Sequence, residues 1–133
     1  MKKRYDFVIA CGGLGTRLNP ITKEIPKPLY PINNKSTIER CIAEISNFSR
    51  SNILITLGYK SNFFLNSIKN LRDKYKISID IHIENNPLGE CGALWLVKDN
   101  LSQDFIFLNG DLIFSIDFGK LLYFHKRISS KLT

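Results

Sequence analysis

The amino-acid sequence predicts an α/β fold with a mostly parallel sheet, and three observations carry that prediction. Strand-like and helix-like patterns alternate along the 133 residues, which is typical of parallel strands joined by crossover helices. Three of the strand-like runs are apolar on both faces, as expected where helices cover both sides of a sheet. Glycine follows the end of each of these runs, at positions 12, 58 and 110.

Strands are expected at four places along the chain. The runs "YDFVIA" at residues 5–10 and "NILITL" at 52–57 are short and apolar, which suits buried strands. In "KISIDIHIE", at 76–84, isoleucines alternate with polar residues, as expected where one face alone is buried. We therefore expect this strand near an edge of the sheet. The run "DFIFLN" at 104–109 completes the set.

Helices are expected between these strands. Ser36 stands three residues before Glu39, which forms a capping box, and apolar residues at helical spacing predict that the helix runs to about Ser49. Further helices are expected to begin near Ser61, to span about 92–101 and to begin near Asp117.

The length and charge of the chain are those of one basic domain. Nothing in the sequence marks a domain boundary, so a single hydrophobic core is expected. The formal net charge is +7, from 19 Lys and Arg against 12 Asp and Glu, and such an excess favours anionic partners such as phosphates. Part of this excess lies at the two ends of the chain, where solvated termini are the simpler interpretation.

The cysteines and the N-terminus indicate the cellular compartment. Cys11, Cys41 and Cys91 form an odd set without a Cys-x-x-Cys pair, which argues against a disulfide framework or zinc site and for a reducing cytoplasm. We expect each to be a small buried hydrophobic residue. The apolar stretch 7–10 is too short for a secretion signal, and no run is long enough to cross a bilayer.

One stretch, "CGGLGTRLNPITKEIPKPL" at residues 11–29, combines flexibility with stiffness. Glycines directly after a strand let backbone amides approach a ligand, most often a phosphate. The patterns of a P-loop and of a dinucleotide-binding loop are both absent here. What remains is a glycine turn that carries Arg17, followed by Lys27 held between Pro26 and Pro28. A fixed positive charge beside backbone amides suits polyphosphate chemistry.

Four motifs in this order resemble the signature of the sugar-1-phosphate nucleotidyltransferases, the enzymes that make NDP-sugars. They are "GGLGTRL", "PKPL", a second glycine loop "PLGECGAL" at 87–94, and "FLNGD" at 107–111. The resemblance covers essentially the whole chain and implies a Rossmann-like three-layer α/β/α fold. Residues 1–133 are expected to be its nucleotide-binding half, incomplete at the C-terminal side. The run "NGDLIFSIDFGKLLYFH" is most similar to the branch of mannose-1-phosphate and D-glycero-D-manno-heptose-1-phosphate guanylyltransferases.

The resemblance implies a reaction and a role for each matching residue. The family transfers a nucleotidyl group from a nucleoside triphosphate to a sugar 1-phosphate and releases pyrophosphate, with Mg²⁺ as cofactor. GTP and a manno-configured sugar are the expected substrates. Arg17 is expected to bind the β- and γ-phosphates, Lys27 to neutralise the α-phosphate, and Asp111 to bind Mg²⁺. The expected nucleotide-binding residues are Gly12, Gly13, Gly15, Thr16, Gly89 and Gly92.

The position of Asp111 supports the same function independently. Ligands of open α/β sheets bind at the carboxyl ends of the strands, where the strand order reverses. If the strand of Phe7 neighbours the strand of Phe105, Asp111 faces the phosphates held by residues 12–17, and its carboxylate is a suitable ligand for Mg²⁺. Two residues depart from the family's pattern, Cys11 in place of alanine and Glu90 in place of threonine.

Two alternatives from other classes stay open. In the family, sugar-contacting residues and a second metal-binding aspartate come from later strands, so this chain is expected to need a complementing C-terminal half or to self-associate through an open sheet edge. Without them it would be a nucleotide-binding module with weak or no catalysis. The second alternative is a basic nucleic-acid-binding domain, but no recognised binding motif is present. We therefore expect neither a nucleic-acid partner nor a membrane partner.

Overall fold

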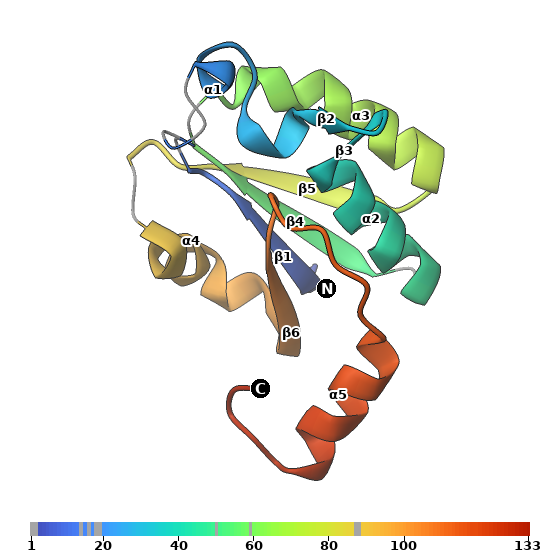
Figure 1. Ribbon diagram of the computed structural model, residues 1–133. Helices are drawn as coiled ribbons and strands as arrows, with labels where there is room; N and C mark the ends of the chain where they lie inside the picture. Colours follow the sequence, from blue (N-terminus) through green and yellow to red (C-terminus); the bar gives the residue numbers. More distant parts are fainter. Residues whose placement is uncertain are drawn as a thin grey trace.

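Four parallel strands form the central sheet of the protein (Figure 1). The structure, a computed structural model, describes residues 3–13, 15, 17, 20–49, 51–58, 60–86 and 89–133. All three neighbouring pairs of strands are parallel, so the predicted α/β fold with a parallel sheet is confirmed. In spatial order the strands are β5 (Ser78–Ile83), β4 (Asn52–Leu57), β1 (Tyr5–Cys11) and β6 (Leu101–Asn109).

The strand order brings the first and last strands of the sheet together. From β1 the chain moves outward to β4 and β5, and it then returns to place β6 on the other side of β1. The two strands pair from Phe7 with Ile106 to Ala10 with Asn109, so their carboxyl ends lie side by side. The expectation that the strands of Phe7 and Phe105 are neighbours is confirmed. β5 lies at an edge of the sheet, as predicted.

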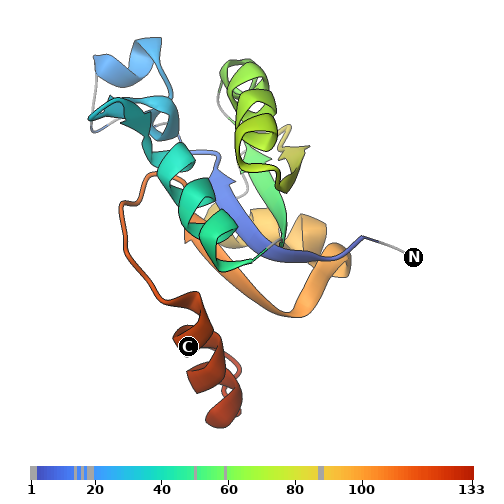
Figure 2. The ribbon, with the colours of Figure 1, turned by 90° about the vertical axis from the view of Figure 1, so that its right-hand side faces the viewer.

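Helices cover the sheet on both faces, which gives three layers (Figures 1 and 2). Alternate residues of a strand point to opposite faces, so Phe7 and Ile9 belong to the larger core on one side and Val8 to the smaller core on the other. The helices on the larger core are α2 (Thr37–Phe48) and α3 (Asn62–Tyr75), and the helix on the smaller core is α4 (Gly89–Val97), followed by the 3-10 turn η3 (Lys98–Asn100).

Within the described ranges, no helix is both long and apolar enough to span a bilayer.

The last helix, α5 (Phe118–Arg127), packs against the larger core through the buried Phe118 and the partly buried Leu121 and Leu122. Phe118 is 2% exposed, and its ring centroid lies 5.2 Å from that of Phe7, 5.7 Å from that of Phe48 and 6.0 Å from that of Phe114. Contacts between aromatic rings at such distances stabilise the fold beyond the burial of the rings. α5 lies at one end of the molecule, and the short helix α1 (Ile21–Glu24) lies at the other end (Figures 1 and 2).

Capping residues explain where the predicted helices begin. Ser36 Oγ accepts a hydrogen bond from the Glu39 amide at 3.3 Å, and Asp117 caps α5 in the same way. The Glu39 carboxylate accepts hydrogen bonds from Lys74 Nζ at 2.7 Å and from the Tyr75 hydroxyl at 3.1 Å, which connects α2 to α3. Burial alone would raise the pKa of Glu39, but the hydrogen bonds from Lys74 and Tyr75 outweigh it and lower that pKa.

The expected bounds of two elements and the expected burial of one cysteine are wrong. α4 spans Gly89–Val97 rather than about 92–101, and β6 begins at residue 101 rather than 104. Two glycines weaken a helix locally, but Ala93 and Val97 are buried and stabilise α4 by packing. Cys91 lies on another face of α4 and is exposed, unlike the buried Cys11 and Cys41.

Short elements that the sequence did not predict fill the chain between β1 and α2. β2 (Pro31–Ile32) and β3 (Lys35–Ser36) form a hairpin whose turn residues, Asn33 and Asn34, have φ values of 49° and 64°. Asparagine tolerates this left-handed region better than most residues, and paired left-handed residues suit a tight hairpin. The short elements are α1 (Ile21–Glu24), the 3-10 turn η2 (Lys27–Leu29), β2 (Pro31–Ile32) and β3 (Lys35–Ser36).

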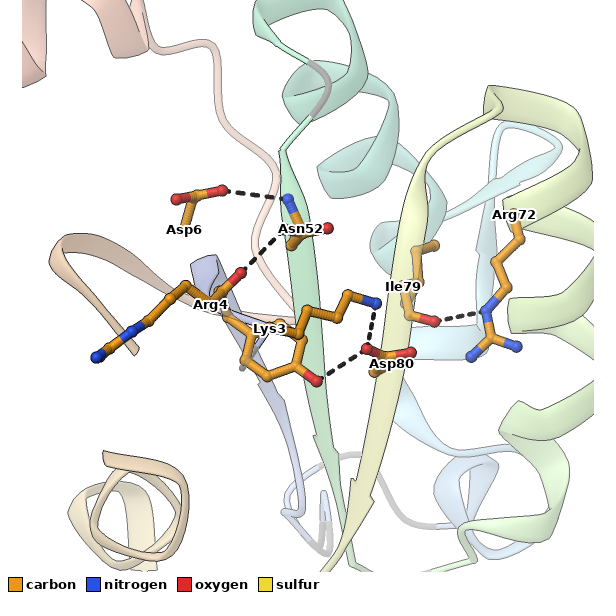
Figure 3. A network of polar contacts seen from close by, with 8 residues as sticks. Lys3, Arg4, Asp6, Asn52, Arg72, Ile79 and Asp80 are labelled. Atoms are coloured by element: carbon orange, nitrogen blue, oxygen red, sulfur yellow. Dashed lines mark hydrogen bonds and ion pairs between the residues drawn. The ribbon is translucent and has the colours of Figure 1, made fainter. Parts of the chain in front are cut away.

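A network of polar contacts holds the start of the chain against the neighbouring strands (Figure 3). Lys3 Nζ lies 2.5 Å from Asp80 Oδ2, and the Tyr5 hydroxyl donates to the same oxygen at 2.8 Å. The Asn52 amide donates to Asp6 Oδ2 at 3.2 Å. Burial and the hydrogen bond to Asp80 raise the pKa of Tyr5 to about 12. These contacts lie toward the amino ends of β1 and β4, away from the carboxyl edge of the sheet, and they stabilise the fold.

Candidate functional site

Lys27 and Asp111 form an ion pair at the carboxyl edge of the sheet. The distance from Lys27 Nζ to Asp111 Oδ2 is 2.5 Å, although the two residues are 84 positions apart in the sequence. Their side chains are 38% and 32% exposed, so a ligand can reach both charges. The structure thus brings together the cation and the carboxylate that the sequence singled out.

Two buried prolines position Lys27. Pro26 and Pro28 are buried on either side of the half-buried lysine. The Leu29 amide donates to Pro26 O at 2.9 Å and the Tyr30 amide donates to Lys27 O at 3.2 Å, which closes the turn η2 around the lysine. Because proline also restricts φ, few backbone conformations are open to this segment. Lys27 is therefore presented on a rigid turn.

The close approach of β6 to β1 positions Asp111. The Gly110 amide donates to Ala10 O at 2.9 Å, which continues the pairing of the two strands by one residue. A Cβ at position 110 would overlap Cys11 Sγ and would lie 3.3 Å from Ala10 O. Glycine is the residue that fits here without displacing the buried sulfur atom. Asp111 follows directly, so its backbone is held against the end of β1.

The glycine-rich loop after β1 reaches the base of the Lys27 side chain. Gly15 has a φ of 63°, a value that favours glycine. The buried Thr22 donates its hydroxyl to Gly15 O at 2.9 Å. A Cβ on Gly15 would lie 3.5 Å from Lys27 Cβ, so the loop and the lysine are neighbours.

An acidic residue, Glu84, stands beside the start of this loop. Its backbone amide donates to Leu57 O at 2.7 Å, and its Oε1 lies 3.5 Å from where a Cβ on Gly12 would be. The next residue, Gly13, is exposed. Because like charges repel, we expect any phosphate on this loop to lie on the side of Lys27 rather than that of Glu84.

Sequence reasoning missed Thr22 and Glu84. Glu84 ends the run "KISIDIHIE", and an acidic residue at the carboxyl end of a parallel strand is a signal that could have found it. The contact of Thr22 with Gly15 has no such signal, because it depends on how the chain folds back after the loop.

The remaining predicted residues make no hydrogen bond or ion pair with Lys27 or Asp111, or they lie outside the described part of the structure. Arg17 is exposed and makes no hydrogen bond or ion pair with any described residue. Gly89 and Gly92 lie in the first turns of α4, on the opposite face of the sheet from α2. Thr16 and the side chain of Glu90 lie outside the described part of the structure.

The chemistry of this edge fits a magnesium ion that a bound phosphate helps to hold. Mg²⁺ prefers oxygen ligands and is commonly bound by one or two carboxylates together with substrate phosphates. Asp111 offers a partly exposed carboxylate at this position. Across the described ranges, no group of three or more His, Cys, Asp and Glu side chains could hold a metal ion. The arrangement therefore suits a metal shared with a ligand.

The thiols beneath the site carry no charge at neutral pH. Burial raises the pKa of Cys11 well above its ordinary value and that of Cys41 to about 12. Cys41 Sγ donates to Leu112 O at 3.7 Å, in the turn that follows Asp111. Both thiols thus act as small buried residues, as predicted for these two.

Residues 7–133 match the nucleotidyl transferase family. Mannose-1-phosphate guanyltransferase from Schizosaccharomyces pombe is 34% identical over 122 residues, which cover 90% of this chain and 34% of that protein. The crystal structure of HddC from Yersinia pseudotuberculosis complexed with GMP-PN has a TM-score of 0.80 at 32% identity, over 91% of this chain and 54% of that chain. The CTP:phosphocholine cytidylyltransferase LicC from Streptococcus pneumoniae has a TM-score of 0.62 at 27% identity, over 83% and 51%.

These relatives agree with the fold and differ in length. Their similarity confirms the Rossmann-like α/β fold that the motifs implied. The chain spans about a third of the length of the curated relative and about half of the length of the solved chains.

Proposed function

Because the chain belongs to the nucleotidyl transferase family, we propose that residues 1–133 form the nucleotide-binding half of a sugar-1-phosphate nucleotidyltransferase. The observation that carries this proposal is the Lys27–Asp111 pair beside a glycine-rich loop, at the point where the strand order reverses. Parallel sheets bind ligands at this point, and phosphate transfer needs fixed charges and amides there.

The proposed reaction needs no nucleophile from the protein. An oxygen of the sugar 1-phosphate attacks the α-phosphorus of the nucleoside triphosphate, and the bond from this phosphorus to the bridging oxygen of the β-phosphate breaks, so that pyrophosphate leaves. We assign the triphosphate to the amides of Gly12, Gly13 and Gly15. Arg17 binds the β- and γ-phosphates, and Lys27 neutralises the charge on the α-phosphate.

Asp111 is assigned to a magnesium ion in this scheme. When bound, Mg²⁺ supplies positive charge to the phosphates and draws the two substrates together. The Asp111 carboxylate would hold that ion beside Lys27, so a carboxylate after β6 and an ammonium group from the turn η2 would both lie near the phosphates. Gly89, Gly92 and Thr16 are assigned to the base, the ribose and the remaining nucleotide contacts.

We propose GTP as the nucleotide and a manno-configured sugar 1-phosphate as its acceptor. The name of the Schizosaccharomyces pombe relative and the GMP-PN bound to HddC support guanine. LicC, which this chain resembles in structure, is named for CTP and phosphocholine, so an assay has to compare other substrates as well.

The open edge of β6 supports a partner that completes the site. Among the described strands, β6 pairs with β1 alone, so its other edge can accept a further strand. We propose that a C-terminal half, or a second copy of this chain, supplies the sugar-binding groups at this edge.

A nucleotide-binding module without turnover is the second candidate function. The observation that favours it is that, among the described residues, Asp111 belongs to no group of three or more His, Cys, Asp and Glu side chains that could hold a metal ion. Removing one preorganised electrostatic group from an active site commonly lowers the rate by about 10²- to 10³-fold. Without a second metal ligand, the chain would therefore bind the nucleotide with little catalysis.

A matrix of nucleotides and sugars tests both candidates. The common nucleoside triphosphates are combined with mannose 1-phosphate, a manno-heptose 1-phosphate and glucose 1-phosphate in the presence of Mg²⁺, and pyrophosphate is measured. Pyrophosphate from GTP with a manno-configured sugar is the expected result. Magnesium-dependent binding of GTP without pyrophosphate from any pair indicates the module. Failure to bind any of the nucleotides contradicts both candidates.

Substitutions at the ion pair test the assigned roles. Lys27→Ala should lower turnover by about 10²-fold or more with a modest loss of nucleotide affinity, and in Asp111→Asn the Mg²⁺-dependent activity should collapse. Lys120→Ala is the matched control, because it removes the same charge from an exposed position on α5. Unchanged turnover in Lys27→Ala would remove the role proposed for the lysine.

A further inference from the structure

A buried threonine, Thr37, connects the segments that carry Lys27 and Asp111, and we propose that it is a positioning residue for this pair. The inference rests on the proposed function, which assigns these two charges to the α-phosphate and the metal. Thr37 is the first residue of α2 and is 4% exposed. Its Oγ1 lies 2.8 Å from Gly110 O and 3.2 Å from Pro28 O. Gly110 directly precedes Asp111, and Pro28 directly follows Lys27.

The Thr37 hydroxyl is not needed to begin its own helix. Ser36 already caps α2, since its Oγ accepts the amide hydrogen of Glu39. Threonine is also a weaker helix former than alanine or leucine, because its β-branch restricts the side chain. Both hydrogen-bond partners of the hydroxyl are carbonyl oxygens outside α2. The side chain therefore serves the two neighbouring segments.

The geometry lets one hydroxyl act on both segments. A hydroxyl carries a single hydrogen, so it donates to one carbonyl at a time, and the shorter distance favours Gly110. Both carbonyl oxygens nevertheless stay within hydrogen-bond distance of the same atom. The turn η2 and the turn after β6 are thus each held against the start of α2, which is a rigid element.

The Lys27–Asp111 ion pair alone would hold these segments weakly. Partly exposed ion pairs contribute little to stability, and a ligand that binds either charge has to separate the two. In the described part of the chain, this ion pair and the Thr37 hydroxyl are the hydrogen-bonded links between residues 26–30 and residues 109–112. The Thr37 contacts are buried, so they persist when the ion pair opens. They keep both charges in place around a bound phosphate.

Thr37→Val is the substitution that isolates the hydroxyl, because valine has nearly the same shape and cannot donate a hydrogen bond. Thr37→Ser restores the donor and removes only a methyl group. The matched control is Thr56→Val in β4, since the buried Thr56 hydroxyl has no hydrogen-bond partner among the described residues. If Thr37→Val does not fold, Thr37→Ala replaces it and leaves more room beside the two carbonyl oxygens.

Amide hydrogen exchange, followed by NMR without any ligand, tests whether Thr37 holds both segments. The Leu29 amide reports on the turn of Lys27, and the Leu112 amide reports on the turn of Asp111. In Thr37→Val both amides should exchange at least about 5-fold faster, whereas the central strands β1 and β4 should not change. Thr37→Ser should behave as the wild type. Unchanged exchange at both amides, or an equal rise in Thr56→Val, would overturn the proposal.

Binding of Mn²⁺ and GTP tests whether this position matters to the proposed site. Binding is followed by the relaxation of water protons around Mn²⁺, which needs no turnover. Thr37→Val should weaken the joint binding by about 5-fold, and Thr37→Ser should restore it. In a Lys27→Ala background the further effect of Thr37→Val should be much smaller, because the group that it positions is gone.

The two measurements separate the failure of this inference from the failure of the proposed function. If Thr37→Val lowers affinity equally with and without Lys27, Thr37 acts on the whole fold and is not a positioning residue for the pair. If the wild-type chain binds no Mn²⁺ with GTP, the proposed function fails, and hydrogen exchange at Leu29 and Leu112 still decides whether Thr37 holds both segments.

Discussion

Gly110→Ala tests whether the close approach of β6 to β1 positions the turn of Asp111. The added methyl group would overlap Cys11 Sγ, and it would lie 3.3 Å from Ala10 O and 3.4 Å from Ile9 Cγ2. Cys11 is buried in the larger core, so its sulfur atom has no free space into which to move. We expect the free energy of unfolding to fall.

The size of the loss follows from two opposing effects. Overpacking a core typically costs about 1–3 kcal/mol. Replacing glycine by alanine also restricts the unfolded chain, which offsets about 0.4–1 kcal/mol of that loss. The net loss should be about 1–2 kcal/mol. Cys11→Ala removes the sulfur atom and leaves the weaker contacts to Ala10 and Ile9, so in that background Gly110→Ala should cost less than about 1 kcal/mol.

Urea unfolding followed by far-UV circular dichroism measures this coupling in the wild type, the two single variants and the double variant. Gly13→Ala is the matched control, because a Cβ at that position would meet nothing within 4 Å. An equal loss from Gly110→Ala with and without Cys11 would refute the explanation from overlap. So would a Gly110→Ala variant as stable as the wild type.

Three further predictions concern the elements around the site. Phe118→Ala should lower the free energy of unfolding in urea by about 3–5 kcal/mol, because the ring is buried, whereas Phe124→Ala on the same helix, where the ring is 51% exposed, should change it by less than about 1 kcal/mol. Ser36→Ala should cost about 1 kcal/mol in the same assay, since it removes the cap of α2; no loss would mean that another group caps the helix. The pKa of Glu39 is lowered in the folded state, so its contribution to stability is present above the ordinary pKa of 4.5 and is lost as the pH falls through the lower folded value. In Glu39→Gln the free energy of unfolding should therefore fall less than in the wild type between about pH 5 and pH 3. An equal fall in the variant and the wild type over this pH range would contradict this assignment.

The pattern of apolar and polar residues determined the strands and most of the helices. Burial on both faces was found in β1 and β4, the strand of "KISIDIHIE" lies at the predicted edge although its Ile83 is exposed, and helices begin after Ser36 and Asp117 as expected. The bounds of α4 were among the least accurate, because the glycines at 89 and 92 indicate a loop locally while packing against the sheet stabilises a helix. The exposure of Cys91 has the same origin, since it depends on which face of α4 meets the sheet.

The sequence by itself also determined which chemistry to look for at the carboxyl edge of the sheet. Glycines, Lys27 and Asp111 each follow or adjoin a predicted element, and in parallel sheets the carboxyl ends of strands lie along one edge. Only the tertiary structure decided that Lys27 Nζ meets Asp111 across 84 residues, that Glu84 stands beside Gly12, and that Thr37 contacts both segments. These contacts join residues that are distant in the chain, so they depend on strand order and packing, which no local pattern of residues encodes.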